Sequence, residues 1–310
     1  MVSSSYTTSD RWSTLTREFE ETLAAWTPSW TRFARLITDK SAALRMFADQ
    51  PASVLSTWNG ADTDTIATPS VGATHTQTLT LDGKAGGVHI RAMDLALQPN
   101  LVEQAVSRLY DSVTRTVESV VYSALEGSFS SSVDNGDGST TEICSLGHMY
   151  KPIGYTSGSL TAQSNLLTSA FSGTAMSSAL QLMQNFKSFN GVPAGYGVGG
   201  TTLIVSPQNG DLANQVAKSA QAITTFTTSG AVDAATGAMM NPRTLQPIDV
   251  VVSPYLTADA DDWWIADTAN TPVFVWMPFS PKIAIFDDYA NHATKITISV
   301  FLKAGVQTPS

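Results

Sequence analysis

The sequence predicts an α+β protein, because its helices and strands are mixed without a βαβ repeat. Three observations predict this class: a long amphipathic helix over 101–126, an alternating strand over 294–303, and several short apolar strands between them. The apolar face of the last strand is formed by Ile296, Ile298, Val300 and Leu302. Its other face is polar, with Phe301 as the one apolar exception.

The composition bounds the size and the partners of the protein. A chain of 310 residues forms one large domain or two medium ones, and 43% hydrophobic residues supply a substantial core. Only 14% of residues are charged, which suits a surface covered by partners and also fits a β-rich secreted protein. The net charge of −9 argues against a protein that grips nucleic acid with its whole surface.

Cysteine usage and hydropathy indicate the compartment. Cys144 is the only cysteine, so no intramolecular disulfide forms, and this fits a reducing compartment. The first residues have neither a basic n-region nor an apolar h-region, so we expect no signal peptide. No apolar run approaches the roughly 20 residues of a membrane helix. We therefore expect a soluble protein, made in a cytoplasm, that does not bind membranes.

Residues 1–53 form a compositionally separate N-terminal segment. They carry six basic and six acidic side chains, so the whole net charge of −9 lies in the remainder. Apolar spacing predicts two short helices here, over 10–26 and 29–48. Both are rich in aromatic residues, which predicts that the segment docks onto something. The proposed anchors are Trp12, Phe19, Trp26 and Phe33.

A Thr-rich hairpin is predicted over 74–93. The first strand is 74–81, the turn lies in Asp82–Gly87, and a return strand follows over 88–93. One face of the first strand presents His75, Gln77, Leu79 and Leu81, and the other presents Thr. Neither face is apolar enough to seal a core, and an isolated two-stranded hairpin is marginal in water. We therefore expect this hairpin to lie on another copy of the chain.

The helix over 101–126 is the strongest local prediction. Asn100 follows Pro99 and is expected to cap it, with Glu103 completing an Asn variant of the capping box. Gly127 is expected to end it at C′. About 26 residues at roughly 1.5 Å each give a rod of roughly 39 Å. The apolar stripe consists of Val102, Ala105, Val106, Leu109, Val113, Val117, Val120, Val121 and Ala124.

The rest of the chain mixes short elements with loops. A loop-rich stretch over 127–165 precedes a helix over 174–190, which Thr174 is expected to cap. A buried strand over 201–205 and a short helix over 210–219 follow, and 220–245 is expected to be a flexible loop. Further strands are predicted over 248–252, 263–266, 272–277 and 282–286.

No motif supports an active site. The Gly-rich run 195–200 precedes a strand instead of following one, so it does not match a phosphate-binding loop. Cys144 and His148 lie four residues apart but lack a nucleophile signature, so Cys144 is taken as structural. The histidines have no metal-ligand spacing. Trp263 and Trp264 are expected to serve core and interface. We predict no enzyme activity, cofactor or metal.

Taken together, the order and spacing of these segments resemble tailed-bacteriophage major capsid proteins of the Hong Kong 97 (HK97) fold, nearest to the Mu-like head subunit branch. The resemblance covers nearly the whole chain. Each motif alone is weak evidence for the family, and the resemblance depends on the order and spacing of the motifs together. The matching segments are the helix 101–126 and residues 142–148, 164–165, 179–183, 190–193, 202–207, 250–256, 262–267 and 294–306.

The resemblance implies a domain organisation. It implies an N-terminal arm over 1–53 and an extended loop, a β-hairpin, over 54–93. A peripheral domain would combine 94–165 with 286–310 around the spine helix 101–126. An axial domain would span 166–285, with 220–245 as its tip at the five- and six-fold axes. The implied assembly interface adds Lys84, Arg91, Trp263 and Trp264 to the hairpin and arm residues named above.

The resemblance also implies a function and partners. The chain would self-assemble as hexamers and pentamers into an icosahedral head that encloses double-stranded DNA without sequence-specific binding. Portal, scaffolding and decoration proteins are expected partners, and assembly would take place in the host bacterial cytoplasm. Some relatives form a Lys–Asn cross-link that needs a nearby Glu. Lys84 lies in the matching extended loop, and Asn291 is the only plausible partner near the final strand. No Glu follows Glu142, so we predict no cross-link.

Three alternatives stay open at this point. An encapsulin-like compartment shares the fold and encloses a cargo enzyme instead of DNA. A secreted β-rich adhesin or tail protein fits the Ser, Thr and Gly content but not the long helix. A Ser or Cys hydrolase needs a site that the sequence does not offer.

Overall fold

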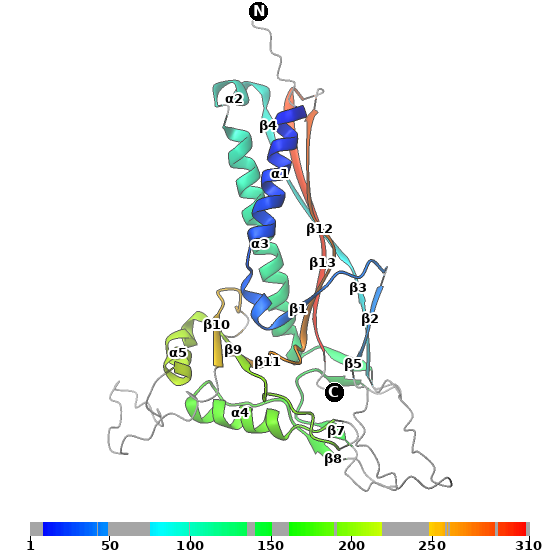
Figure 1. The fold of residues 1–310 in the computed structure, drawn as a ribbon, viewed down its shortest axis with the longest axis vertical. Helices are drawn as coiled ribbons and strands as arrows, with labels where there is room; N and C mark the ends of the chain where they lie inside the picture. Colours follow the sequence, from blue (N-terminus) through cyan, green and yellow to red (C-terminus); the bar gives the residue numbers. More distant parts are fainter. Residues whose placement is uncertain are drawn as a thin grey trace, which may run out of the picture.

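The computed structural model describes residues 9–41, 43–48, 75–98, 100–134, 140–150, 161–188, 191–218, 248–257, 259, 261–288 and 291–307. Figure 1 shows a rod of long helices and strands standing on a broader base of short elements. The rod contains α1 (Ser9–Ala25), α2 (Ala92–Leu97), α3 (Leu101–Glu126), β1 (Ala34–Ile37), β4 (Asp82–Arg91), β12 (Val273–Asp288) and β13 (Ala293–Val306). The base contains α4 (Gly173–Asn185), α5 (Gly210–Lys218), β7 (His148–Tyr150), β8 (Thr161–Gln163), β9 (Thr201–Val205), β10 (Ile248–Val252) and β11 (Trp263–Asp267).

The predicted spine helix is confirmed as α3, with the same bounds. Seven positions of the predicted stripe are buried, and Val120 and Ala124 are partly buried against the same core. Both predicted caps are wrong. The Asn100 side chain makes no capping hydrogen bond, and Gly127 has right-handed angles (φ −65, ψ −16) that carry the chain into a 3-10 turn, η2 (Gly127–Phe129). Burial of the apolar stripe, not capping, therefore stabilises this helix.

A four-stranded sheet with the order β1-β12-β13-β4 runs along α3. One face of β13 packs against α3 through Ile296, Ile298, Val300 and Leu302, which confirms the predicted alternation. The predicted strands 272–277 and 282–286 are one strand, β12. Its register shifts twice between Trp276 and Lys282, around Pro278 and Pro281. Proline at such irregularities is expected, because it cannot donate to the ladder.

The predicted hairpin over 74–93 is wrong. β3 (His75–Thr80) pairs with β2 (Ala43–Ala48), whereas β4 pairs along its whole length with β13, from Asp82↔Leu302 to Arg91↔Ala293. The glycines of 82–87 do not turn the chain, and Gly87 allows β4 and β13 to approach closely. A Cβ on Gly87 would lie 2.8 Å from the Ile296 carbonyl oxygen. β3 and β4 are thus nearly continuous strands in two different sheets.

The predicted helix over 29–48 is also wrong. Its residues form a 3-10 turn, η1 (Ser29–Arg32), followed by β1 and β2. β1 adds in parallel to β12, with Ala34 opposite Val273, and this tertiary pairing overrides the helical spacing. β2 begins a second four-stranded sheet, β2-β3-β5-β6, with β5 (Ser132–Asp134) and β6 (Thr140–Glu142). The first predicted helix is confirmed as α1.

The base is built around the sheet β10-β9-β11, in which every residue of β9 is buried. α4 ends at Asn185, and its cap is Ser172, whose hydroxyl accepts from the Ala175 amide at 3.0 Å. The predicted Thr174 cap and the extension to residue 190 are therefore wrong. The predicted loop 220–245 lies outside the described residues.

Candidate assembly interface

Two of the predicted arm anchors belong to the chain's own core. Phe19 is 2% exposed and meets Tyr110 edge-on, and Phe33 is 0% exposed and packs against Tyr122. Both rings lie between the arm and α3, so they are not available to a neighbouring subunit. The aromatic pattern correctly predicted docking, but the surface on which these rings dock is the chain's own spine helix.

The other predicted contacts divide in the same way. Trp26 is half-buried against the core, and Leu79 is buried with Leu81 packed beside it. Trp264 is buried, where it stacks on Phe129, and Trp263 is half-buried with its Nε1 donating to the Ser169 carbonyl at 3.1 Å. The side chains of Trp12, His75 and Gln77 lie outside the described residues.

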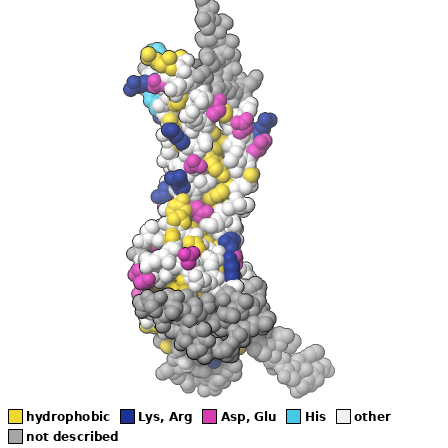
Figure 2. Space-filling model, turned by 90° about the vertical axis from the view of Figure 1, so that its left-hand side faces the viewer, with side chains coloured by type: hydrophobic (Ala, Val, Ile, Leu, Met, Phe, Trp, Pro, Cys, Tyr) yellow, Lys and Arg dark blue, Asp and Glu magenta, His cyan; other side chains and the backbone are white. Residues whose placement is uncertain are grey.

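Lys84 and Arg91 are exposed on β4, which forms an edge of the rod sheet. At the beginning of the same strand, Lys303 donates to the Asp82 carboxylate at 2.8 Å. This hydrogen bond and the Lys303 charge hold the pKa of Asp82 below its usual value. Figure 2 shows that acidic and basic side chains are interspersed on one side of the rod, with apolar side chains between them. Such a surface is suited to contact a partner surface that also carries both acidic and basic side chains.

The outer face of the rod sheet carries exposed aromatic residues that the sequence reasoning did not select. Phe279 and Phe301 are 44% and 43% exposed and contact each other edge-on, and the Lys40 ammonium lies 5.8 Å above the Phe279 ring. The signal in the sequence was Phe301, the single apolar residue on the polar face of the last strand. Apolar aromatic residues on an otherwise polar sheet face are typical of interfaces.

The base of the β2–β3 hairpin covers the adjoining part of this face. Leu44 and Leu79 from the hairpin pack on Phe274 and Trp276 of β12, and both β12 side chains are 0% exposed. The Trp276 Nε1 donates to the Asp39 carbonyl at 2.7 Å. These contacts anchor one end of the β2–β3 hairpin on β12.

The arm also joins the rod to the base of the molecule. The Arg32 guanidinium forms a bidentate ion pair with the Asp249 carboxylate of β10. The Arg32 carbonyl accepts a hydrogen bond from the Thr202 hydroxyl of β9 at 3.1 Å. Nearby, the Ser29 amide and hydroxyl both donate to the Glu118 carboxylate, at 2.9 and 2.8 Å. η1 thus contacts α3, β9 and β10 at once and fixes their relative positions.

Tyr122 completes this junction. Its hydroxyl lies 2.6 Å from the Ser29 hydroxyl, and its ring is fully buried. Burial raises the pKa of Tyr122 to about 12; the Glu118 charge also raises it, and the hydrogen bond with Ser29 acts in the opposite direction. The folded protein therefore keeps this proton at a pH where the unfolded chain, with a pKa near 10.0, loses it.

This pKa predicts a pH-dependent difference between wild type and Tyr122→Phe. The raised pKa stabilises the fold fully below pH 10, and the contribution is lost as pH rises towards 12. We expect the wild type to exceed Tyr122→Phe by about 1 kcal/mol in unfolding free energy at pH 8, for the lost hydrogen bond. That gap should shrink between pH 10 and 11.5 in urea titrations. A gap independent of pH would contradict the assigned environment.

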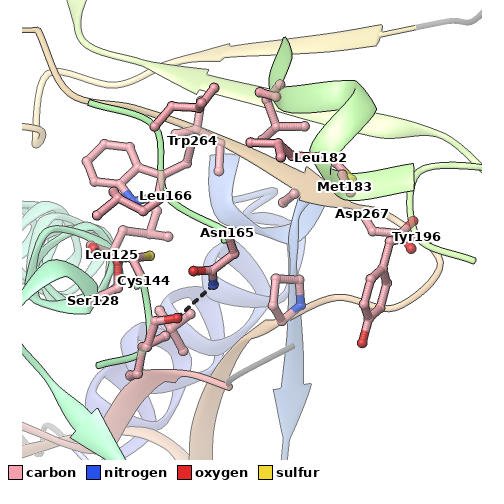
Figure 3. Close-up of a pocket in the computed structure, with 18 of the residues that line it drawn as sticks. Leu125, Ser128, Cys144, Asn165, Leu166, Leu182, Met183, Tyr196, Trp264 and Asp267 are labelled. Atoms are coloured by element: carbon pink, nitrogen blue, oxygen red, sulfur yellow. Dashed lines mark hydrogen bonds between the residues drawn. The ribbon is translucent and has the colours of Figure 1, made fainter. Parts of the chain in front are cut away.

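The described residues offer no activated nucleophile or metal centre. Burial raises the pKa of the Cys144 thiol, which shares a hydrogen bond with the Ser128 hydroxyl at 3.2 Å. Figure 3 shows Cys144 and Ser128 in the wall of a pocket, where the Asn165 amide donates to the Ile143 carbonyl at 2.7 Å. The His148 Nε2 lies within hydrogen-bond distance of the Ile143 carbonyl and the Asn165 side chain. It therefore faces these groups and does not form a catalytic dyad with Cys144. Among described His, Cys, Asp and Glu side chains, no group of three could hold a metal ion. None of the described helices has the length and apolarity to cross a membrane.

Comparisons with known proteins place the chain among proteins of one class. The family model for phage capsid protein matches residues 74–308. No curated protein matches the sequence.

Several solved structures share the fold. The capsid of an empty GTA particle is 13% identical with a TM-score of 0.53, and the match covers 91% of this chain and 87% of the other. The procapsid of bacteriophage JBD30 is 10% identical with a TM-score of 0.51, covering 98% and 73%. The mature capsid of bacteriophage PhiM1 is 11% identical with a TM-score of 0.51, covering 92% and 85%. At these identities the likeness shows a common fold.

Proposed function

Because the chain belongs to the phage capsid protein family, we propose how its surfaces join copies of the subunit into a shell. The protein is a major capsid protein with the HK97 fold, and its place is the virion capsid. Its role is structural, and we propose that it has no catalytic function. The Mu-like branch stays a prediction.

The observation that carries the assembly proposal is the β2–β3 ladder, which ends with Ala48 opposite His75. Residues 49–74 connect the paired strands β2 and β3 in the sequence, so we assign the extended loop to 43–80 instead of 54–93. We propose that it lies on a neighbouring subunit, over the part of the outer sheet face that contains Phe279 and Phe301. Aromatic side chains at the centre of such a contact supply a large share of its stability.

The domain boundaries follow from the same assignment. The arm comprises α1, η1 and β1, and the peripheral domain comprises α2, α3, β4, β12 and β13. The axial domain comprises α4, α5 and the sheet β10-β9-β11. Compared with the boundaries expected from sequence, this assignment moves β4 and all of β12 into the peripheral domain, because both pair with β13.

We further propose hexamers and pentamers as the capsomers, assembled in the host cytoplasm with portal, scaffolding and decoration proteins. DNA would be enclosed without sequence-specific contacts. The charges interspersed on the side of the rod seen in Figure 2 and the net charge of −9 support this, because neither indicates a continuous basic surface. The family match favours a phage head over a cargo-enclosing compartment.

Negative-stain electron microscopy and light scattering of the purified full chain test the proposal. Closed shells, or rings of five or six 32.9 kDa subunits, are the expected result. Shells dissolved in hot detergent should give a single 32.9 kDa band, because no Lys84–Asn291 cross-link is expected. A strict monomer, both alone and with the phage's other head proteins, would refute self-assembly.

A further inference from the structure

The rod sheet has one face that its two long helices do not cover. Figure 1 shows α1 and α3 on the same side of the sheet, and the buried residues of β13 point towards α3. Residues directly opposite each other in antiparallel strands share a face, so the register places Lys282, Lys295 and Arg91 on the other face. All three are exposed, and so is Lys40, which lies over the Phe279 ring of that face. Four cations thus gather on this outer face, although the whole chain has a net charge of −9.

None of these four cations forms an ion pair in the part of the chain that the structure describes. Two carboxylates of the same sheet are engaged with other side chains. Asp288 lies 3.5 Å from the His89 Nε2, and Asp82 accepts a hydrogen bond from Lys303 at 2.8 Å. The outer face therefore has an excess of positive charge and favours a partner surface that carries carboxylates.

Two lysine–phenylalanine pairs lie at the ends of the exposed part of this face. The Lys40 ammonium lies 5.8 Å from the centre of the Phe279 ring, and the Lys295 ammonium lies 5.7 Å from the centre of the Phe286 ring. The two phenylalanines are opposite residues of β13 that are six positions apart, which corresponds to about 20 Å. Apart from Lys282, the outward residues between them are small, namely Ala85, Gly87, Ala284, Thr297 and Ser299. A polypeptide segment can therefore lie on this part of the sheet between the two aromatic rings.

The segment that joins β2 to β3 has the opposite charge. Residues 49–74 lie outside the described residues, and their sequence contains Asp49, Asp62 and Asp64 but no lysine or arginine. Asp62 and Asp64 are two positions apart, within a run rich in Thr and Ala. This segment is thus an acidic counterpart to the basic outer face.

The position of the β2–β3 ladder favours a neighbouring subunit as the place where this segment binds. The hairpin packs on β12 through Leu44 and Leu79, whereas residues 49–74 begin and end at the far end of the ladder, at Ala48 and His75. Half of these 26 residues can span about 40 Å when extended. The segment is therefore long enough to reach the outer face of another copy.

We propose that Asp62 and Asp64 of one subunit bind the basic outer face of its neighbour, with Lys282 and Lys295 as their main partners. This inference rests on the proposed function, because it names the charges that position the extended loop. Exposed ion pairs contribute little stability one by one, but opposite charges on two surfaces select the partner and fix its placement. These charges would therefore decide where the loop binds, and the aromatic rings would hold it there.

Charge reversal in the full chain tests the pairing. Lys282→Glu with Lys295→Glu should prevent closed shells, and so should Asp62→Lys with Asp64→Lys, because each pair of changes brings like charges together. Both variants should melt within a few degrees of wild type, since the two lysines are exposed and Asp62 and Asp64 belong to the loop. The control is Arg108→Glu with Arg115→Glu, which makes the same change of net charge at exposed positions of α3 and should assemble.

Restored assembly is the decisive result. All four changes in one chain should give closed shells again by electron microscopy. An equimolar mixture of the two reversed variants should also give shells, because each loop then meets opposite charge on the other variant. Rescue in one chain but not in the mixture would place the contact within a single subunit and overturn the proposal.

Two further outcomes would also overturn it. If neither rescue succeeds while replacement of 49–74 by a short turn prevents assembly, the extended loop stands and only this charge pairing fails. If the Lys282→Glu, Lys295→Glu variant forms normal shells that retain less DNA, the outer face binds nucleic acid instead. Shells formed without residues 49–74 would contradict the extended-loop assignment itself.

Discussion

Replacing residues 49–74 with an Asn-Gly turn should give a subunit that folds normally and forms no closed shells. Ala48 and His75 stand opposite each other at the end of the β2–β3 ladder, so a two-residue turn can join them without changing the register. The apolar base of the hairpin, which packs on Trp276, is untouched. Thermal melting would report the fold, and electron microscopy would report assembly.

A matched control exists in the same sheet. β5 and β6 end with Asp134 opposite Thr140, so residues 135–139 can be replaced by the same turn. We expect this control to assemble. Shells formed by the 49–74 replacement would refute the extended-loop assignment. Deleting 76–89 would not be a clean test, because it removes most of β3 and β4 and so opens the rod sheet.

Trp276→Ala should lower the free energy of unfolding by about 3–5 kcal/mol, as expected when a fully buried tryptophan is truncated. The side chain is 0% exposed and joins the hairpin to the rod sheet through Leu44 and Leu79. We therefore expect amide exchange to increase first in β2 and β3. Urea unfolding and hydrogen exchange would measure the two effects.

Phe279→Ala is the control on the same strand. Phe279 is 44% exposed, so its removal should change stability by no more than about 1 kcal/mol. If it forms part of the intersubunit contact, assembly should weaken although the monomer stays stable. Equal losses of stability in the two variants would contradict the division of this sheet face into a covered and an open part.

The helices and strands that could be predicted are those that bury one continuous apolar face, because such a face is visible as a periodic pattern in the sequence. The spine helix and the last strand are each specified by a long periodic pattern, and α1, β9 and β10 are local apolar segments of the same kind. Phe301 already departed from its pattern, and this exception marks the open face of the sheet.

The hairpin and the arm were not predictable because their partners are distant in sequence. Gly83, Gly86 and Gly87 look like a turn, yet all three pair with β13, more than two hundred residues later, and at Gly87 the backbone of β13 leaves no room for a Cβ. Residues 34–37 likewise become a strand only because the edge of β12 is there to accept them. The burial of Phe19 and Phe33 against α3 follows from the same tertiary packing.

The passage of the chain from β3 into β4 has a mechanical consequence. Only Leu81 separates the two strands, so if the loop holds a neighbouring subunit as proposed, tension on β3 passes through Leu81 into β4. β4 is held by β13 from Asp82 to Arg91, and pulling along a strand loads all of these backbone pairs together. The hydrogen bonds between β4 and β13 must then break together in shear, and cannot be broken one after another. The internal pressure of a filled shell would therefore be resisted by the full length of this ladder.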